Sequence, residues 1–170
     1  MNYLIIVIIM AVVIGPIMWM MPSARQRQQM AVRQYALAQG FTIKVTDLPQ
    51  SHRQRVRKEP VKQGVVYRLP LQQDRPLVMS QVYCLSRGII DDVQEPQSTD
   101  YEWQGQPLNE AETWFTEALQ QCPRTAVAIE YSAAGVGCYW QERGGEAAVE
   151  QIKVALQQLR KQLKQLKVSP

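Results

Sequence analysis

Residues 126–167 read AVAIEYSAAGVGCYWQERGGEAAVEQIKVALQQLRKQLKQLK, and this stretch decides the fold class. Two β-rich runs, 126–131 and 136–140, flank a short turn, and this pattern predicts a β-hairpin. Apolar residues then recur every three or four positions, which predicts an amphipathic helix over 146–167. Strands followed by a helix that can cover them favour the α+β class, a small antiparallel sheet with helices on one face.

The same rules predict the remaining elements of a soluble domain over residues 41–170. Further strands are expected at 41–45, 65–69, 77–85 and 101–103, the second and third of them joined by a turn. A helix is expected to begin at Asn109, which can cap it, and to end near Gln121. Its apolar face comprises Trp114, Phe115, Ala118 and Leu119. The segment 49–60, which contains SHRQRVRKEP, has no apolar periodicity and is predicted to be a basic loop.

The N-terminal run from Tyr3 to Met21, YLIIVIIMAVVIGPIMWMM, contains no charged residue. About 20 apolar residues suffice to cross the hydrocarbon core of a bilayer, so residues 1–21 are predicted to form a single transmembrane helix. A cleaved signal peptide fits less well, because no basic residue precedes the apolar core and that core is long. Residues 22–40 are predicted to form a basic juxtamembrane helix, with Ser23 as its cap and Gly40 at its end.

Positive charge flanks the apolar run on its C-terminal side alone. Arg25, Arg27 and Arg33 follow the run, whereas Met1 and Asn2 carry no side-chain charge. Because loops rich in Lys and Arg stay in the cytoplasm, the N-terminus is predicted to lie outside and the domain inside.

The stretch MPSARQRQQM at residues 21–30, with the apolar run before it and Gly40 after it, resembles the small accessory subunit of the bacterial preprotein translocase. That family has one N-out span, then a proline, a basic Gln-rich helix and a small cytoplasmic β domain. The resemblance covers residues 1–40 and ends there, since the Gly-Gly turn of the family is missing. It implies a single-pass protein of the bacterial inner membrane, and it transfers no functional residue.

Charge is distributed unevenly along the chain. Residues 25–58 contain eight basic residues and one acid, whereas residues 91–117 contain eight acids and no basic residue. One interpretation is two solvated faces; the other is a basic surface that meets anionic lipid headgroups or an acidic partner. The residues predicted for such contacts are Arg25, Arg27, Arg33, Arg53, Arg55, Arg57 and Lys58.

No cluster of residues predicts catalysis or a cofactor. His52 is the single histidine, and it lies in the basic segment with no carboxylate or nucleophile near it in sequence. Gly135 and Gly137 form a GxG without the following helix of a nucleotide loop, so a tight hairpin with a close backbone approach is expected instead. We therefore predict no catalytic residue and no cofactor.

No metal site is predicted either. The cysteines Cys84, Cys122 and Cys138 form no CxxC pair and fit no zinc spacing. Free thiols in a reducing compartment are expected, and one disulfide with a spare cysteine is the alternative. The acids of Asp91, Asp92 and Glu95 match no EF-hand loop, and a solvated acidic loop is expected there.

These patterns favour a membrane-tethered, non-enzymatic interaction or assembly module with an unidentified protein partner. The alternative is a membrane-surface enzyme or a small-ligand-binding domain whose site the sequence does not reveal. A deep pocket with several titratable groups would favour the alternative, and a flat charged patch would favour the first function. The absence of aromatic residues near the basic segment argues against nucleic acid.

Overall fold

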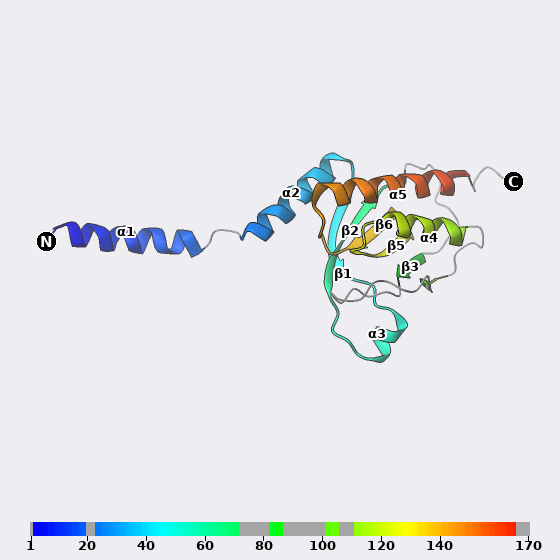
Figure 1. Ribbon diagram of the computed structural model, residues 1–170, viewed down its shortest axis with the longest axis horizontal. Helices are drawn as coiled ribbons and strands as arrows, with labels where there is room; N and C mark the ends of the chain where they lie inside the picture. The colour runs from blue at the N-terminus through cyan, green and yellow to red at the C-terminus, as the bar shows by residue number, and fades with distance from the viewer. Residues whose placement is uncertain (1, 20–22, 72–81, 87–100, 106–110, 166–170) are drawn as a thin grey trace.

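The computed structural model describes residues 2–19, 23–71, 82–86, 101–105 and 111–165, and Figure 1 shows how they are arranged. The elements in chain order are α1 (Asn2–Trp19), α2 (Ala24–Ala38), β1 (Thr42–Asp47), α3 (His52–Val56), β2 (Gln63–Leu69), β3 (Val82–Ser86), β4 (Tyr101–Gln104), α4 (Ala111–Gln121), β5 (Ala126–Ser132), β6 (Gly135–Trp140) and α5 (Gly145–Gln165). This composition confirms the predicted α+β character of the domain. The turn predicted after β2, the cap at Asn109 and the acids at 91–95 lie outside the described residues.

The six strands form one antiparallel sheet in the order β1-β2-β6-β5-β3-β4. The predicted hairpin of β5 and β6 is confirmed. Gly135 has φ +135°, and a Cβ added there would lie 2.1 Å from the carbonyl oxygen of Leu69, so only glycine fits this approach.

The predicted pairing of β2 with the following strand is wrong, because β6 lies beside β2 and β3 pairs with β4 and β5. Every residue of β6 is buried, so this strand has to lie in the middle of the sheet with a neighbour on each edge. A local turn signal after β2 contains no information about that requirement.

Helices α2, α4 and α5 cover one face of the sheet and form the main core with it (Figure 1). The helix predicted at the C-terminus is present as α5, and its apolar stripe docks onto the sheet rather than facing a partner helix. The fully buried residues of that stripe are Val149, Ile152, Leu156, Leu159 and Leu163. At about 1.5–3 kcal/mol for each buried side chain, this helix is a major contributor to the stability of the fold.

The opposite face of the sheet carries a smaller apolar cluster of Leu48, Val66, Ala128 and Tyr139. Beside it lies the fully buried carboxylate of Glu130. Arg68 forms an ion pair with Glu130, and the Tyr139 hydroxyl donates a hydrogen bond of 2.6 Å to the other carboxylate oxygen. Both oxygens of Glu130 are therefore satisfied, as a buried charge requires.

Helix α2 has the ends that the sequence predicts. Ser23 forms a capping box with Gln26, and Gly40 adopts φ +86° while the N–H of Phe41 donates to the carbonyl oxygen of Ala36. Val32 and Ala36 are buried in the main core, so α2 belongs to the same packed unit as the sheet.

The transmembrane prediction for residues 1–21 is contradicted. Within the described ranges, no helix is both long enough and apolar enough to cross a membrane. The predicted single-pass topology, the N-out orientation and the inner-membrane location rested on this span and are corrected with it.

The segment 49–60 is not wholly a loop, because it contains the short helix α3. Ser51 forms a second capping box, with Gln54, and this local pair starts the helix without any apolar face. The prediction failed here because hydrophobic periodicity was the criterion, and α3 buries no residue.

Candidate functional site

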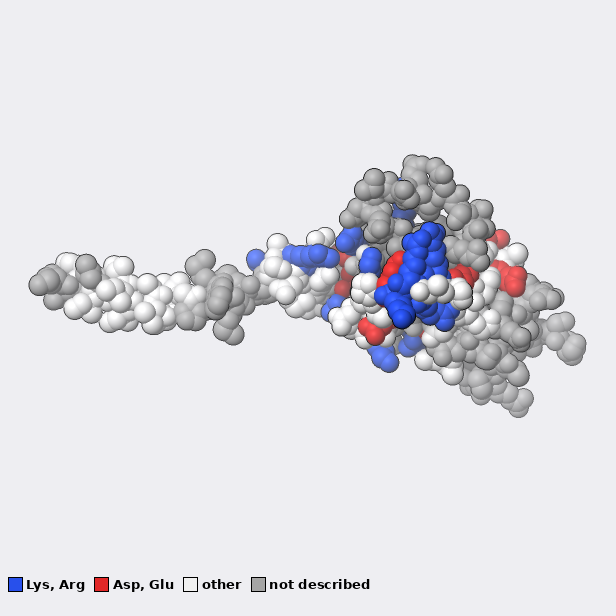
Figure 2. Space-filling view, turned by 90° about the horizontal axis from the view of Figure 1, so that it is seen from below, with Lys and Arg blue, Asp and Glu red and all other residues white. Residues whose placement is uncertain are grey.

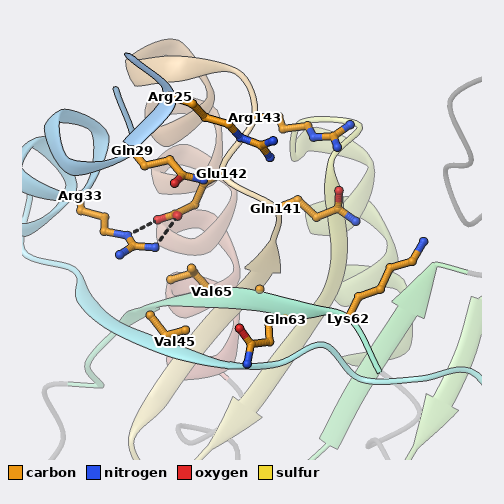
Figure 3. Close-up of a pocket in the computed structure, with 11 residues that line it drawn as sticks. Arg25, Gln29, Arg33, Val45, Lys62, Gln63, Val65, Gln141, Glu142 and Arg143 are labelled. Atoms are coloured by element: carbon orange, nitrogen blue, oxygen red, sulfur yellow. Dashed lines mark hydrogen bonds and ion pairs between the residues drawn. The ribbon is translucent and has the colours of Figure 1, made fainter. Parts of the chain in front are cut away.

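A cavity of about 420 Å³ lies between α2, the β1–β2 edge of the sheet and the connection from β6 to α5 (Figure 3). Its walls are mainly polar and its charged groups are mainly cationic. The residues that line it are Arg25, Gln29, Arg33, Val45, Lys62, Gln63, Gly64, Val65, Gln141, Glu142 and Arg143.

Helix α2 supplies one wall through Arg25, Gln29 and Arg33. These residues are spaced four apart, so they lie along one face of the helix. In Figure 3, Arg25 extends from α2 toward the connection that carries Gln141, Glu142 and Arg143. The capping box at the start of α2 and the glycine turn at its end fix the position of this wall.

Arg33 closes one side of the cavity by pairing with Glu142. Its Nε and Nη2 atoms donate hydrogen bonds of 2.7 Å each to the two carboxylate oxygens, a bidentate arrangement. The Tyr67 hydroxyl donates a further hydrogen bond of 2.9 Å to Oε1 of Glu142. The Glu142 side chain is 2% exposed and that of Arg33 is 35% exposed, so the pair lies at the boundary between core and cavity.

The electrostatics of this contact keep Arg33 and Tyr67 in their hydrogen-bonding forms. The hydrogen bonds that Arg33 donates to Glu142 raise the pKa of Arg33, which remains a cation. Burial, followed by the nearby Glu142 carboxylate, raises the pKa of Tyr67, which remains a hydroxyl donor. Glu142 itself has φ +53°, a backbone conformation that is costly for a residue with a side chain. The three-way contact therefore holds a strained residue in place.

The rest of the cavity has an excess of positive charge. Because Arg33 neutralises Glu142, the charges of Arg25 and Lys62 are left over around the same space, which Arg143 also lines. In the part of the chain that the structure describes, no acid forms an ion pair with Arg25 or Lys62. The amides of Gln29, Gln63 and Gln141 can add neutral donors. This combination can hold an anionic group.

The structure divides the predicted contact residues between two places. Arg25 and Arg33 line the cavity, whereas Arg27 does not. Arg53, Arg55, Arg57 and Lys58 lie on α3 and the turn after it. His52 lies at the start of α3, exposed, with its backbone N–H bonded to Glu102.

Sequence reasoning missed Lys62, Glu142 and Arg143. The four-residue spacing of Arg25, Gln29 and Arg33 was a usable signal for a polar helix face. Nothing in the sequence indicated that residues more than a hundred positions later would face it, since strand order brings them together. All three cysteines are free and buried. Among the residues with described positions, no three His, Cys, Asp or Glu side chains gather as metal ligands.

Comparison with known proteins returned no match. No family model, no curated protein and no solved structure shows significant similarity to this chain. The resemblance of residues 1–40 to the translocase accessory subunit therefore stays an expectation, and the function has to be argued from the site.

Proposed function

We propose that this protein is a non-enzymatic binding module that holds an anionic group of a partner molecule in the α2 pocket. The observation that carries the proposal is the surplus charge of Arg25 and Lys62 around a cavity of about 420 Å³ whose carboxylate is already paired. Like charges around one cavity repel one another, and an anion between them relieves that repulsion.

The arrangement supports binding more than catalysis. The lining residues contain no Cys, Ser, Thr or His, so no side chain offers a ready nucleophile or a general base that titrates near neutral pH. Glu142 is engaged by Arg33 and Tyr67, which removes it as a proton acceptor. Positioning of an anion is the chemistry that the remaining cations and amides support.

The expected affinity for a small anion is modest. A hydrogen bond to a charged group contributes about 1.5–3 kcal/mol, so two of them would give about 3–6 kcal/mol. That range corresponds to dissociation constants between about 6 mM and about 40 μM. A larger partner that also contacts the rim of the pocket would bind more tightly.

The test is titration of the full chain with two compact anions, inorganic pyrophosphate and tricarballylate, followed by isothermal calorimetry or amide NMR shifts. The two probes separate phosphate from carboxylate recognition. We expect at least one to bind, to weaken with added salt, and to bind at least fivefold more weakly to Arg25→Gln and Lys62→Gln. Arg53→Gln removes the same charge on α3, outside the pocket, and serves as the matched control.

Two results would refute the pocket as the site. One is the absence of saturable binding of both probes at low ionic strength. The other is an equal loss of affinity in Arg53→Gln and in the pocket variants, which would show a response to net charge alone.

A further inference from the structure

Helix α3 is joined to strand β4 by polar contacts. The Glu102 carboxylate on β4 accepts hydrogen bonds of 2.7 and 2.9 Å from the backbone N–H of His52. The Gln104 side chain donates a bond of 2.8 Å to the carbonyl oxygen of Gln50. The helix buries none of its residues, so apolar packing does not account for its presence.

The side chains of α3 sort onto two faces. His52 and Arg55, three positions apart, lie on the side of Glu102, and Arg55 approaches that carboxylate at 3.6 Å. Arg53, Val56 and Arg57 have the spacing i, i+3 and i+4, and they form an exposed face of their own. Val56 is 67% exposed between the two arginines.

The turn after α3 adds one more cation in an unusual conformation. Lys58 has φ +53° at the position where helices generally end in glycine. The N–H of Lys58 donates to the carbonyl oxygen of Arg55 and that of Glu59 to Gln54, so the C-terminal motif is complete. A lysine here costs backbone strain that glycine would avoid, and its charge lies next to the exposed arginines.

We infer that Arg53, Val56, Arg57 and Lys58, the α3 surface, form a docking site for an acidic segment of a partner protein, separate from the α2 pocket. Figure 2 shows Lys and Arg side chains gathered over this part of the molecule. The three cations of α3 and the turn after it match carboxylates of an acidic segment by charge. Val56 at their centre matches an apolar side chain within that segment.

The chemistry favours a peptide over nucleic acid. The α3 surface contains no aromatic side chain on which a base could stack. An exposed valine gains nothing from a phosphate backbone, whereas it can pack against a leucine or isoleucine flanked by acids. None of the residues of the α3 surface lines the α2 pocket, so either site can fail without the other.

The test uses the full chain and a fluorescein-labelled twelve-residue peptide of Asp and Glu with one central Leu, monitored by anisotropy at two salt concentrations. We expect salt-sensitive binding that is at least fivefold weaker in the triple variant Arg53→Gln, Arg57→Gln, Lys58→Gln. The charge-preserving variant Arg53→Lys, Arg57→Lys should stay within about twofold. Val56→Ser should weaken the peptide with Leu and leave a peptide with Gly in its place unchanged.

Three results would overturn the inference. The first is equal binding by the triple variant, whose fold is checked by circular dichroism. The second is tighter binding of a 16-base-pair DNA duplex than of the peptide. The third is loss of peptide binding in the variant Arg25→Gln, Lys62→Gln, while the triple variant still binds the peptide. That pattern would place the peptide in the α2 pocket and support the proposed function while refuting the α3 surface.

Discussion

The Arg33 guanidinium on α2 donates two hydrogen bonds of 2.7 Å to the carboxylate of Glu142, which follows 109 residues later in the connection between β6 and α5. Helix α2 buries only Val32 and Ala36 within the described part of the chain. The ion pair is therefore a principal attachment of α2 to the domain, and it also fixes one wall of the pocket. Stability and ligand binding share this contact.

Replacement of Arg33 by Ala should lower the free energy of unfolding by about 2 kcal/mol. Loss of one partner from a buried ion pair costs about 3–5 kcal/mol, and the 35% exposure of Arg33 reduces that figure because solvent screens its charge. Urea unfolding followed by tryptophan fluorescence measures the change. Arg27→Ala removes an exposed arginine from the same helix and should change stability by less than about 0.5 kcal/mol. Equal effects of the two substitutions would show that the pair contributes nothing beyond charge.

Replacement of Lys58 by Gly should stabilise the protein by about 1 kcal/mol, because glycine adopts the left-handed conformation without the steric cost that lysine bears. The same substitution should weaken binding of the acidic peptide, since it removes a charge from the α3 surface. Thermal unfolding and anisotropy measure the two effects. Lys58→Ala keeps the strain and removes the charge, so it should weaken binding without the gain in stability.

Helix α4 packs through Phe115 more than through Trp114. Phe115 is fully buried and contacts Trp103 edge-on at 5.8 Å, whereas Trp114 is half-buried at the margin of the core. Phe115→Ala should therefore cost about 3–5 kcal/mol and Trp114→Ala about half as much. The denaturant midpoints of the two variants show which substitution destabilises the protein more, provided that the dependence of the unfolding free energy on denaturant concentration is the same in both. A larger loss for Trp114→Ala would contradict the packing described for this helix.

Stability should fall as pH rises above 9. Burial raises the pKa of Cys84 from 9.0 to about 12, and burial followed by the hydrogen bond to Glu130 raises the pKa of Tyr139 above 10.0. The unfolded chain releases these protons first, so the contribution is fully present below pH 9 and is lost as pH rises toward the folded pKa values. Each such group lowers stability by up to about 1.4 kcal/mol per pH unit.

Urea midpoints at pH 8, 9, 10 and 10.5 test this dependence. Cys84→Ser should lessen the decline between pH 9 and 10, because serine does not titrate there. A midpoint that stays constant across this range would show that the buried thiol and phenol keep ordinary pKa values.

Local chemistry made several elements predictable from the sequence. The capping box at Ser23, the left-handed turn at Gly40 and the hairpin turn at Gly135 depend on a few neighbouring residues, and all three are present. The apolar stripe of α5 was predictable for the same reason, since apolar residues that recur with a period near 3.6 identify a buried helix face. Helix α3 was missed because a polar capping box starts it and it has no apolar periodicity by which to recognise it.

Apolar composition alone misled the reading of the N-terminus. A run without charge predicted a span, but in the part of the chain that the structure describes no helix is both long enough and apolar enough to cross a membrane. The order of the strands could not be predicted either, because a turn signal after β2 does not reveal that β6 pairs with β2 on the edge opposite β1.

The sequence by itself determined the α+β class, the caps of α2, the β5–β6 hairpin and the amphipathic character of α5, because each depends on residues close together in the chain. The tertiary structure alone decided that Arg33 pairs with Glu142 and that Arg25, Lys62 and Arg143 surround one cavity. These groups come from α2, from the chain just before β2 and from the connection after β6. They meet because burial of β6 places it against β2, and that is a long-range requirement of the core.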